Sequence, residues 1–184
     1  MLVLIKTREE LVDYIHHGNN VELLFFWGHQ KPKNGVSKSC FSQWYDAPFE
    51  CDGYHFMTAE HYMMHKKALL FGDMVSAEKV LSASNPGEAK AIGREVKGFN
   101  NEKWIENRFE IVVNANVAKF SSNTKLKEFL LNTGEQVLVE ASPVDRIWGI
   151  GLAEDHPTAN NPSQWKGLNV LGFALMVVRD NLAR

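Results

Sequence analysis

The amino-acid sequence predicts an α+β domain that is mostly helical and contains a small β-sheet. Most of the chain carries helix-start signals or helical periodicity, whereas only two apolar runs and one hairpin signal indicate strands. No proline-, glycine- or serine-rich linker divides the 184 residues, and a chain of this length can bury one core of its own. We therefore expect residues 1–184 to form a single domain.

The first expected elements are a short helix and a strand. Thr7 followed by Glu10 forms a capping-box pattern, in which the two side chains satisfy free backbone amides at a helix start. Gly18 suits the left-handed position at the end of this helix. The compact apolar run Val21–Trp27 then predicts a strand.

A polar loop and a hairpin are expected next. Residues Gly28–Tyr45 are rich in turn formers, and loops of this kind often carry binding groups. Asp52-Gly53 is a hairpin signal inside the segment Phe49–Phe56. The lysines of the loop either steer an anionic substrate or belong to a solvated loop: Lys31, Lys33 and Lys38.

The middle of the chain predicts consecutive helices. Thr, Asp and Asn residues at their starts offer a side-chain oxygen to the free amides of the first turn. Asn85-Pro86 is a strong signal, because the missing amide of a proline costs nothing at the first helical position. The expected helices run from Thr58 to about Leu70, from Asp73 to about Ser82, from Asn85 to near Lys97-Gly98, from Asn101 to Phe120 and from Thr124 to Asn132.

The C-terminal part predicts a second strand and a final helix. The strand is expected over the apolar run Val137–Ala141. Pro143–Lys166 is irregular and interrupted by prolines and glycines. Leu168–Leu182 is amphipathic and predicts the last helix.

Charge and cysteine content narrow the class of protein. The formal net charge of -2 argues against extended, non-specific binding of nucleic acid, although not against a pocket that reads one nucleotide. Cys40 and Cys51 are too few for a disulfide framework or for a zinc site of thiolates alone. No apolar run approaches the roughly 18 residues of a membrane span. We therefore expect a soluble, cytoplasmic protein with reduced thiols and no membrane partner.

The helix expected after Thr58 carries charge on its apolar side. Glu60 and Lys67 are seven residues apart, so they lie within roughly 20° of each other on a helical wheel. Met63 and Met64 flank them. Because burying unpaired charge is costly, the two residues form either a buried ion pair or a functional site with shifted pKa values.

Two histidines share another face of the same helix. His61 and His65 are four residues apart, a spacing that can chelate a metal ion. His55 is the one candidate for a third ligand, and the acid precedes both histidines instead of lying between them. We therefore expect solvated histidines and no metal, with a metallohydrolase as a competing hypothesis.

The motifs around this helix resemble the NADAR/YbiA-like family. Glu60-His61-Tyr62 with Lys67 is similar to the family's Glu-His-Tyr signature, which a lysine follows on the same helix. Similar pieces recur in the family's order over about residues 21–182, and so many motifs in one order are specific. They are Phe25-Phe26-Trp27, Phe41-Ser42-Gln43-Trp44-Tyr45, Asp52-Gly53, Gly93-Arg94-x-Val96, Trp104-x-x-x-Arg108, Lys119-Phe120, Leu130-Leu131-x-Thr133-Gly134, Leu138-Val139-Glu140-Ala141-Ser142-Pro143-x-Asp145, Trp148-Gly149-x-Gly151 and Trp165-x-Gly167-x-Asn169-x-Leu171-Gly172.

The resemblance implies a mostly helical fold with one central pocket and the hydrolysis of N-glycosidic bonds without a metal or organic cofactor. Two substrate classes are implied: ribosylaminopyrimidine phosphates, which are intermediates of riboflavin synthesis, and ADP-ribose attached to guanine in nucleic acid. The competing class is a binding module for ADP-ribose or an NAD derivative that performs no chemistry. Loss of Glu60, Lys67 or Asp145 would favour such a module, and all three are present.

The chain also departs from the family pattern. The first twenty residues have no recognised counterpart. Gln43-Trp44 replaces the usual Asn-Phe pair after Ser42 and affects contacts on the phosphate side. The segment Leu152–Gln164 is longer than in compact members, which suggests a lid or an altered substrate choice.

Three residues are expected to carry the chemistry. Cleavage of a ribosyl–nitrogen bond needs an acid near the departing nitrogen and a base or nucleophile near the sugar. Glu60 is the candidate acid/base, and Lys67 is either an anchoring cation or a nucleophile that forms a Schiff base. The resemblance makes Asp145 a carboxylate that positions water or binds ribose hydroxyls, whereas its sequence context alone suggests a turn aspartate.

The remaining candidates are expected to bind substrate. Aromatic rings stack on bases or pack in a core, glycines let the backbone approach a ligand or make a turn, and arginines hold phosphate or form salt bridges. The resemblance adds the loop that follows Phe41. The binding candidates are Trp104, Trp148, Gly149, Arg94, Arg108, Ser42 and Trp44.

Overall fold

Side-chain caps fix where most of the helices begin. The computed structural model describes residues 5–184, and helix α1 (Arg8–His16) opens with the predicted Thr7–Glu10 capping box. Thr, Asp or Asn side chains also accept a backbone N–H at the starts of five further helices: α2 (Ala59–Leu70), α3 (Met74–Leu81), α4 (Pro86–Arg94), α5 (Asn101–Ser121) and α6 (Thr124–Leu131). These helices confirm the sequence prediction, although α4 ends earlier than expected.

The strands form two separate pairs. β1 (Leu23–Phe26) pairs in parallel with β4 (Val137–Glu140), and Leu23 lies opposite Val137. β2 (Phe49–Cys51) and β3 (Tyr54–Phe56) form the predicted hairpin. Its turn places Asp52 and Gly53 at positive φ angles of 53° and 81°. The α+β class is confirmed, with its strands divided between two small sheets.

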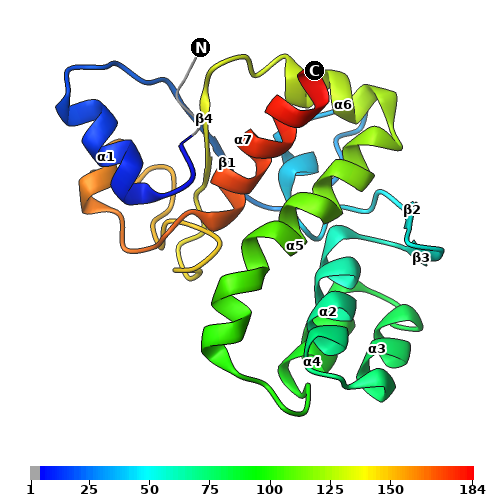
Figure 1. Cartoon of the computed structure of the whole chain (residues 1–184). Helices are drawn as coiled ribbons and strands as arrows, with labels where there is room; N and C mark the ends of the chain where they lie inside the picture. The colour runs from blue at the N-terminus through cyan, green and yellow to red at the C-terminus, as the bar shows by residue number, and fades with distance from the viewer. Residues whose placement is uncertain (1–4) are drawn as a thin grey trace.

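Two parts of the molecule lie at opposite ends of the long helix α5. Helices α2, α3 and α4 pack together near its N-terminal end, whereas β1, β4 and α7 (Val170–Ala183) lie beyond its middle (Figure 1). We call these parts the helical cluster and the sheet side. The apolar core extends between them and includes Phe26, Met63 and Leu175. Within residues 5–184, no helix is long and apolar enough to cross a membrane.

Asn169 holds the loop after β4 against that strand. It is fully buried with a positive φ of 55°, and its side chain accepts from the Glu140 N–H and donates to the Leu138 carbonyl, both at 2.9 Å. Its own N–H donates to the Gly149 carbonyl. A Cβ on Gly149 would lie 2.8 Å from the Glu140 carbonyl oxygen, so this close approach requires glycine.

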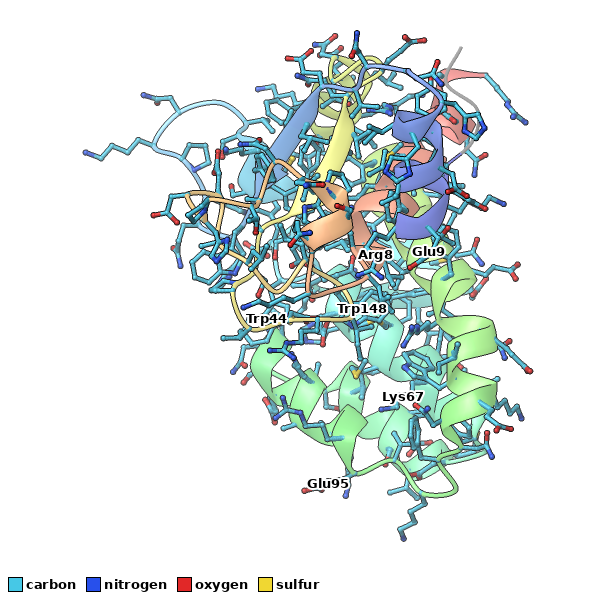
Figure 2. All side chains as sticks on the ribbon, turned by 90° about the vertical axis from the view of Figure 1, so that its left-hand side faces the viewer. Arg8, Glu9, Trp44, Lys67, Glu95 and Trp148 are labelled. Atoms are coloured by element: carbon cyan, nitrogen blue, oxygen red, sulfur yellow. The ribbon has the colours of Figure 1, made fainter. Side chains whose placement is uncertain are left out.

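Short 3-10 turns interrupt the two segments that were expected to be irregular. η1 (Lys38–Phe41) lies in the polar loop, and η2 (Pro162–Gln164) lies in the long C-terminal segment. Helix α1, which carries the labelled Arg8, packs against η2 (Figure 2). The Arg8 guanidinium donates to the Trp165 carbonyl at 2.9 Å. The N-terminal helix therefore covers the C-terminal segment.

Candidate active site

A cavity of about 490 Å³ gathers most of the predicted site residues. Trp44 and Trp148 lie where the sheet side meets the helical cluster, and Lys67 lies below them within the helical cluster (Figure 2). The cavity is a concave site of the size that binds small ligands. The predicted residues that line it are Ser42, Trp44, Glu60, Lys67, Arg94, Trp104, Asp145 and Trp148.

Glu60 is a buried acid in the first turn of α2. Its side chain is 3% exposed, and its N–H donates to the Gln43 carbonyl at 3.0 Å. Burial raises the pKa of Glu60 to about 7, with Lys90 opposing the rise and Asp145 adding to it. Near neutral pH the carboxyl therefore exchanges between its protonated and ionised forms, as acid/base chemistry requires.

Lys67 is held beside Glu60 but does not form an ion pair with it. Its Nζ donates to the Gly93 carbonyl at 2.7 Å and lies 4.6 Å from the Phe99 ring centroid and 5.5 Å from that of Trp104. Burial lowers the pKa of Lys67, although Glu60 opposes the shift. The lowered pKa favours the neutral amine that a nucleophilic lysine needs.

Glu140 is a second acid in the cavity, half-buried as a residue, and sequence reasoning did not select it. It ends β4, lines the cavity, and leaves Oε2 buried without a hydrogen-bond partner. Burial raises its pKa to about 8, with the charges of Asp145 and Glu60 adding to the rise. The available signal was an acid directly inside the apolar run Val137–Ala141.

Asp145 organises the loop that carries Trp148. Its Oδ1 accepts from the N–H groups of Ile147 at 2.9 Å and Trp148 at 2.8 Å, and its own N–H donates to Ser142 Oγ. This is the turn aspartate that the local sequence indicated. Since Asp145 also lines the cavity, the turn and the site share one residue.

Cationic side chains from α4 line the same cavity. Lys90 and Arg94 are one helical turn apart, so they share a face of α4. Lys90 Nζ lies 5.8 Å from the centroid of a Trp44 ring. Sequence reasoning selected Arg94 but missed Lys90, although their spacing was a usable signal.

Two predicted binding residues do not line the cavity. Gly149 packs against the backbone of β4 as described above, so its missing side chain serves the loop rather than a ligand. Arg108 is 9% exposed, and its guanidinium carbon lies 6.0 Å from the Trp148 ring. Arg108 therefore contacts a cavity-lining ring instead of the cavity. The segment Leu152–Gln164, for which a lid or an altered substrate choice was expected, does not line the cavity either.

The expectation that His61 and His65 are solvated is wrong. They are 1% and 2% exposed, and burial lowers the pKa of both. His61 Nε2 lies 3.1 Å from the Ala83 carbonyl and Nδ1 lies 2.8 Å from Thr58 Oγ1, so both ring nitrogens have protein partners. Across residues 5–184, no group of three His, Cys, Asp or Glu residues could hold a metal ion.

Comparisons with known proteins relate both the sequence and the fold to one family. The sequence profile of the NADAR domain matches residues 25–183. An N-glycosidase of Acanthamoeba polyphaga mimivirus is 42% identical over 162 residues, which cover 85% of this chain and 94% of the viral protein. A riboflavin biosynthesis protein of Vibrio vulnificus is 32% identical over 77% of this chain, and the match covers 35% of that protein.

The Escherichia coli N-glycosidase YbiA matches in sequence and in structure. It is 31% identical over 145 residues, which cover 79% of this chain and 80% of YbiA. Its solution structure superposes with a TM-score of 0.71 at 27% identity, covering 88% of this chain and 85% of that structure. The expected resemblance and the fold class are thereby confirmed.

Proposed function

This chain belongs to the NADAR family and is a hydrolase of N-glycosyl bonds, and from that premise we propose that it cleaves the bond between a phosphorylated ribose and an amino nitrogen of a base. The observation that carries the proposal is the pair of desolvated carboxyls, Glu60 and Glu140, which line one cavity and whose pKa values are raised to about 7 and about 8. Such pairs supply an acid and a base close to neutral pH.

The two carboxyls divide the proton transfers. Glu140, whose Oε2 is buried without a hydrogen-bond partner and whose pKa is raised, delivers its proton to the departing amino nitrogen as the C1′–N bond breaks. Glu60 accepts the proton of a water molecule whose oxygen forms the new bond to C1′. Asp145 fixes the loop that carries Trp148, which places an aromatic face in the cavity for the base. Proton exchange with solvent restores both carboxyls after release.

Lys67 supports an alternative covalent route to the same products. An amino-linked riboside opens its sugar ring to an imine, and a neutral lysine amine attacks the imine carbon. The base leaves as its free amine, and water then hydrolyses the lysine Schiff base to release the sugar aldehyde. The lowered pKa of Lys67 favours this route. Reductive trapping with borohydride during turnover distinguishes it, because only the covalent route gives a stable sugar adduct on Lys67.

A ribosylaminopyrimidine phosphate is the substrate class that we favour. The cavity volume of about 490 Å³ suits one nucleotide-sized molecule. Lys90 and Arg94 offer charge to a phosphate at the wall formed by α4. A relative named as a riboflavin biosynthesis protein agrees with this class. ADP-ribosyl-guanine in nucleic acid is the second substrate to test.

A side-by-side hydrolysis assay tests the proposal. Wild type, Glu60→Gln and the exposed control Glu106→Gln are incubated with each substrate in the presence of EDTA, and mass spectrometry measures the released sugar. We expect turnover by wild type and by the control, with at least about a hundredfold loss in Glu60→Gln. Tight substrate binding without turnover by folded wild type would instead support a non-catalytic module. Turnover abolished by EDTA would support the metallohydrolase.

A further inference from the structure

Gln43 is a buried residue of the cavity wall with an unused hydrogen-bond donor. Its side chain is 6% exposed and lines the cavity. Its Oε1 accepts from Asn116 Nδ2 at 2.7 Å, whereas its Nε2 is buried without a partner. An amide nitrogen carries two hydrogens, and leaving it unsatisfied in the interior destabilises the fold. The unused donor is therefore a candidate for contact with a ligand.

The neighbouring residues determine which end of the Gln43 amide is unused. Asn116 Nδ2 donates to the Val112 carbonyl at 2.9 Å as well as to Gln43. Turning the Asn116 amide around would place Oδ1 against that carbonyl oxygen, and two acceptors repel each other. Since Asn116 must present a donor, Gln43 must present its oxygen to Asn116. The Gln43 nitrogen is thus left over.

The backbone around Gln43 is fixed beside the buried acid. Its carbonyl accepts the Glu60 N–H at 3.0 Å, which ties the loop to the first turn of α2. Lys119, 1% exposed on α5, donates to the carbonyls of Cys40 at 2.6 Å and Ser42 at 2.9 Å. These bonds hold the loop on both sides, so the backbone of Gln43 has a defined place in the wall beside the first turn of α2, and Asn116 orients its side-chain amide.

We propose that Gln43 Nε2 donates a hydrogen bond to the ribose 2′-hydroxyl of the substrate, and that Asn116 is the positioning residue that orients this donor. The inference rests on the proposed function and makes Gln43 a determinant of sugar specificity. An uncharged donor suits a hydroxyl oxygen, while the cations of α4 are available for phosphate.

The Gln43 carbonyl accepts the Glu60 N–H, so the two residues are neighbours in the cavity wall. In the proposed complex the 2′-hydroxyl lies next to the sugar carbon on which Glu60 acts, and hydrogen bonds to that hydroxyl strengthen as charge develops on the sugar. A 2′-deoxyribosyl substrate leaves the buried donor unpaired and is therefore discriminated against.

The test compares two substrates across variants. The kcat/KM of wild type, Gln43→Met and Gln43→Glu is measured on a ribosylaminopyrimidine phosphate and on its 2′-deoxy analogue. Both substitutions keep the length of the side chain, and both remove the amide donor. Each variant is compared with wild type on the same substrate, so that the intrinsic lability of the deoxy sugar cancels. We expect about a tenfold loss on the ribosyl substrate and little loss on the deoxy analogue.

Controls separate this role from a structural one. Gln164→Met changes an exposed glutamine far from the cavity wall and should leave both values unchanged. Asn116→Leu should reduce the preference for ribose in the same direction as Gln43→Met, because the donor is no longer oriented. Equal losses on both substrates in the folded Gln43 variants, or no loss on either, would overturn the role of Gln43 and leave the proposed function standing. No turnover by wild type on either substrate would overturn the proposed function, and this inference with it.

Discussion

Two buried regions of this chain treat polar groups in opposite ways. Behind the cavity, Lys119 donates to two backbone carbonyls, and Asn169 bonds to the backbone of β4 in both directions. In the cavity wall, Glu140 Oε2 and Gln43 Nε2 are buried without partners. The first region satisfies its polar groups within the protein, and the second leaves them available.

The difference teaches which polar residues serve the fold and which serve a ligand. Buried polar atoms in native proteins nearly always have partners, because an unpaired one destabilises the folded state. Lys119 and Asn169 follow that rule and position the loops of the site. Glu140 and Gln43 depart from that rule in the lining of the cavity, where a substrate would supply the missing partner. His65 Nδ1, Asn116 Oδ1 and Arg179 Nε are also buried without partners, but these residues do not line the cavity. Substitutions should therefore have opposite effects on stability in the two regions.

The largest effect is expected from Glu140→Gln. Removing the acid should lower kcat by about a thousandfold, because general acid catalysis contributes on that scale. The same substitution should raise the free energy of unfolding at pH 8, since an uncharged amide has no buried charge to desolvate. Enzyme assays and urea unfolding measure the two quantities, with the exposed Glu106→Gln as control. A loss of both activity and stability would show that Glu140 stabilises the fold, as Lys119 and Asn169 do.

Lys119→Met should have a large effect of the opposite kind. The substitution leaves the Cys40 and Ser42 carbonyls without their donor, and we expect the free energy of unfolding to fall by about 3 kcal/mol. Lys125→Met, at an exposed position on α6, is the matched control. Urea unfolding at neutral pH checks the difference, and equal stability of the two variants would contradict the structural role of Lys119.

The pH dependence of stability sharpens the comparison further. Glu60 and Glu140 have pKa values of about 7 and about 8 in the native state, above the usual 4.5. The native state thus keeps protons that the unfolded state has released, so their contribution to stability is complete below pH 4.5 and is lost as pH rises towards 8. At about 1.4 kcal/mol per pKa unit, the two acids together give an expected fall on the order of 6 kcal/mol between about pH 5 and about pH 8.

The double variant Glu60→Gln/Glu140→Gln is the reference for this measurement. Lys119 acts in the other direction, because burial lowers its pKa to about 7 and its contribution makes stability rise with pH above that value. Subtracting the curve of the double variant removes the lysine contribution, since both proteins contain it. A difference between the curves that does not change with pH would contradict the raised pKa values of the two acids.

The smallest effect compares two arginines. Arg94 lines the cavity, so Arg94→Met should raise KM by about tenfold through the loss of a phosphate contact. Arg108 contacts Trp148 from outside the cavity, so Arg108→Met should leave KM within about threefold of wild type. Steady-state kinetics on the same substrate measure the two KM values. A larger rise in KM for Arg108→Met than for Arg94→Met would identify Arg108 as a binding residue.

The local elements were largely predictable from the sequence. Caps such as Thr58 and Asn85 and the turn Asp52-Gly53 act over a few residues, so their patterns are complete in the chain itself. The spacing of Glu60 and Lys67 correctly indicated two charged groups on the buried side of one helix, although not that Lys67 would bond to the Gly93 carbonyl instead of Glu60. That carbonyl belongs to another helix, whose approach no local pattern specifies.

The sequence by itself determined the α+β class, the helix starts and the family motifs, because local hydrogen bonds and side-chain periodicity depend only on residues that are close in sequence. Only the tertiary structure decided which polar groups stay unpaired. It paired β1 with β4, which are far apart in the chain, and brought Glu140 and Glu60 into the lining of one cavity. It also placed Gly149 and Arg108 where they pack against other parts of the protein instead of lining that cavity. Whether a polar side chain is buried, and whether it finds a hydrogen-bond partner, depends on which distant segments pack against it. Both are therefore set by the folded chain as a whole.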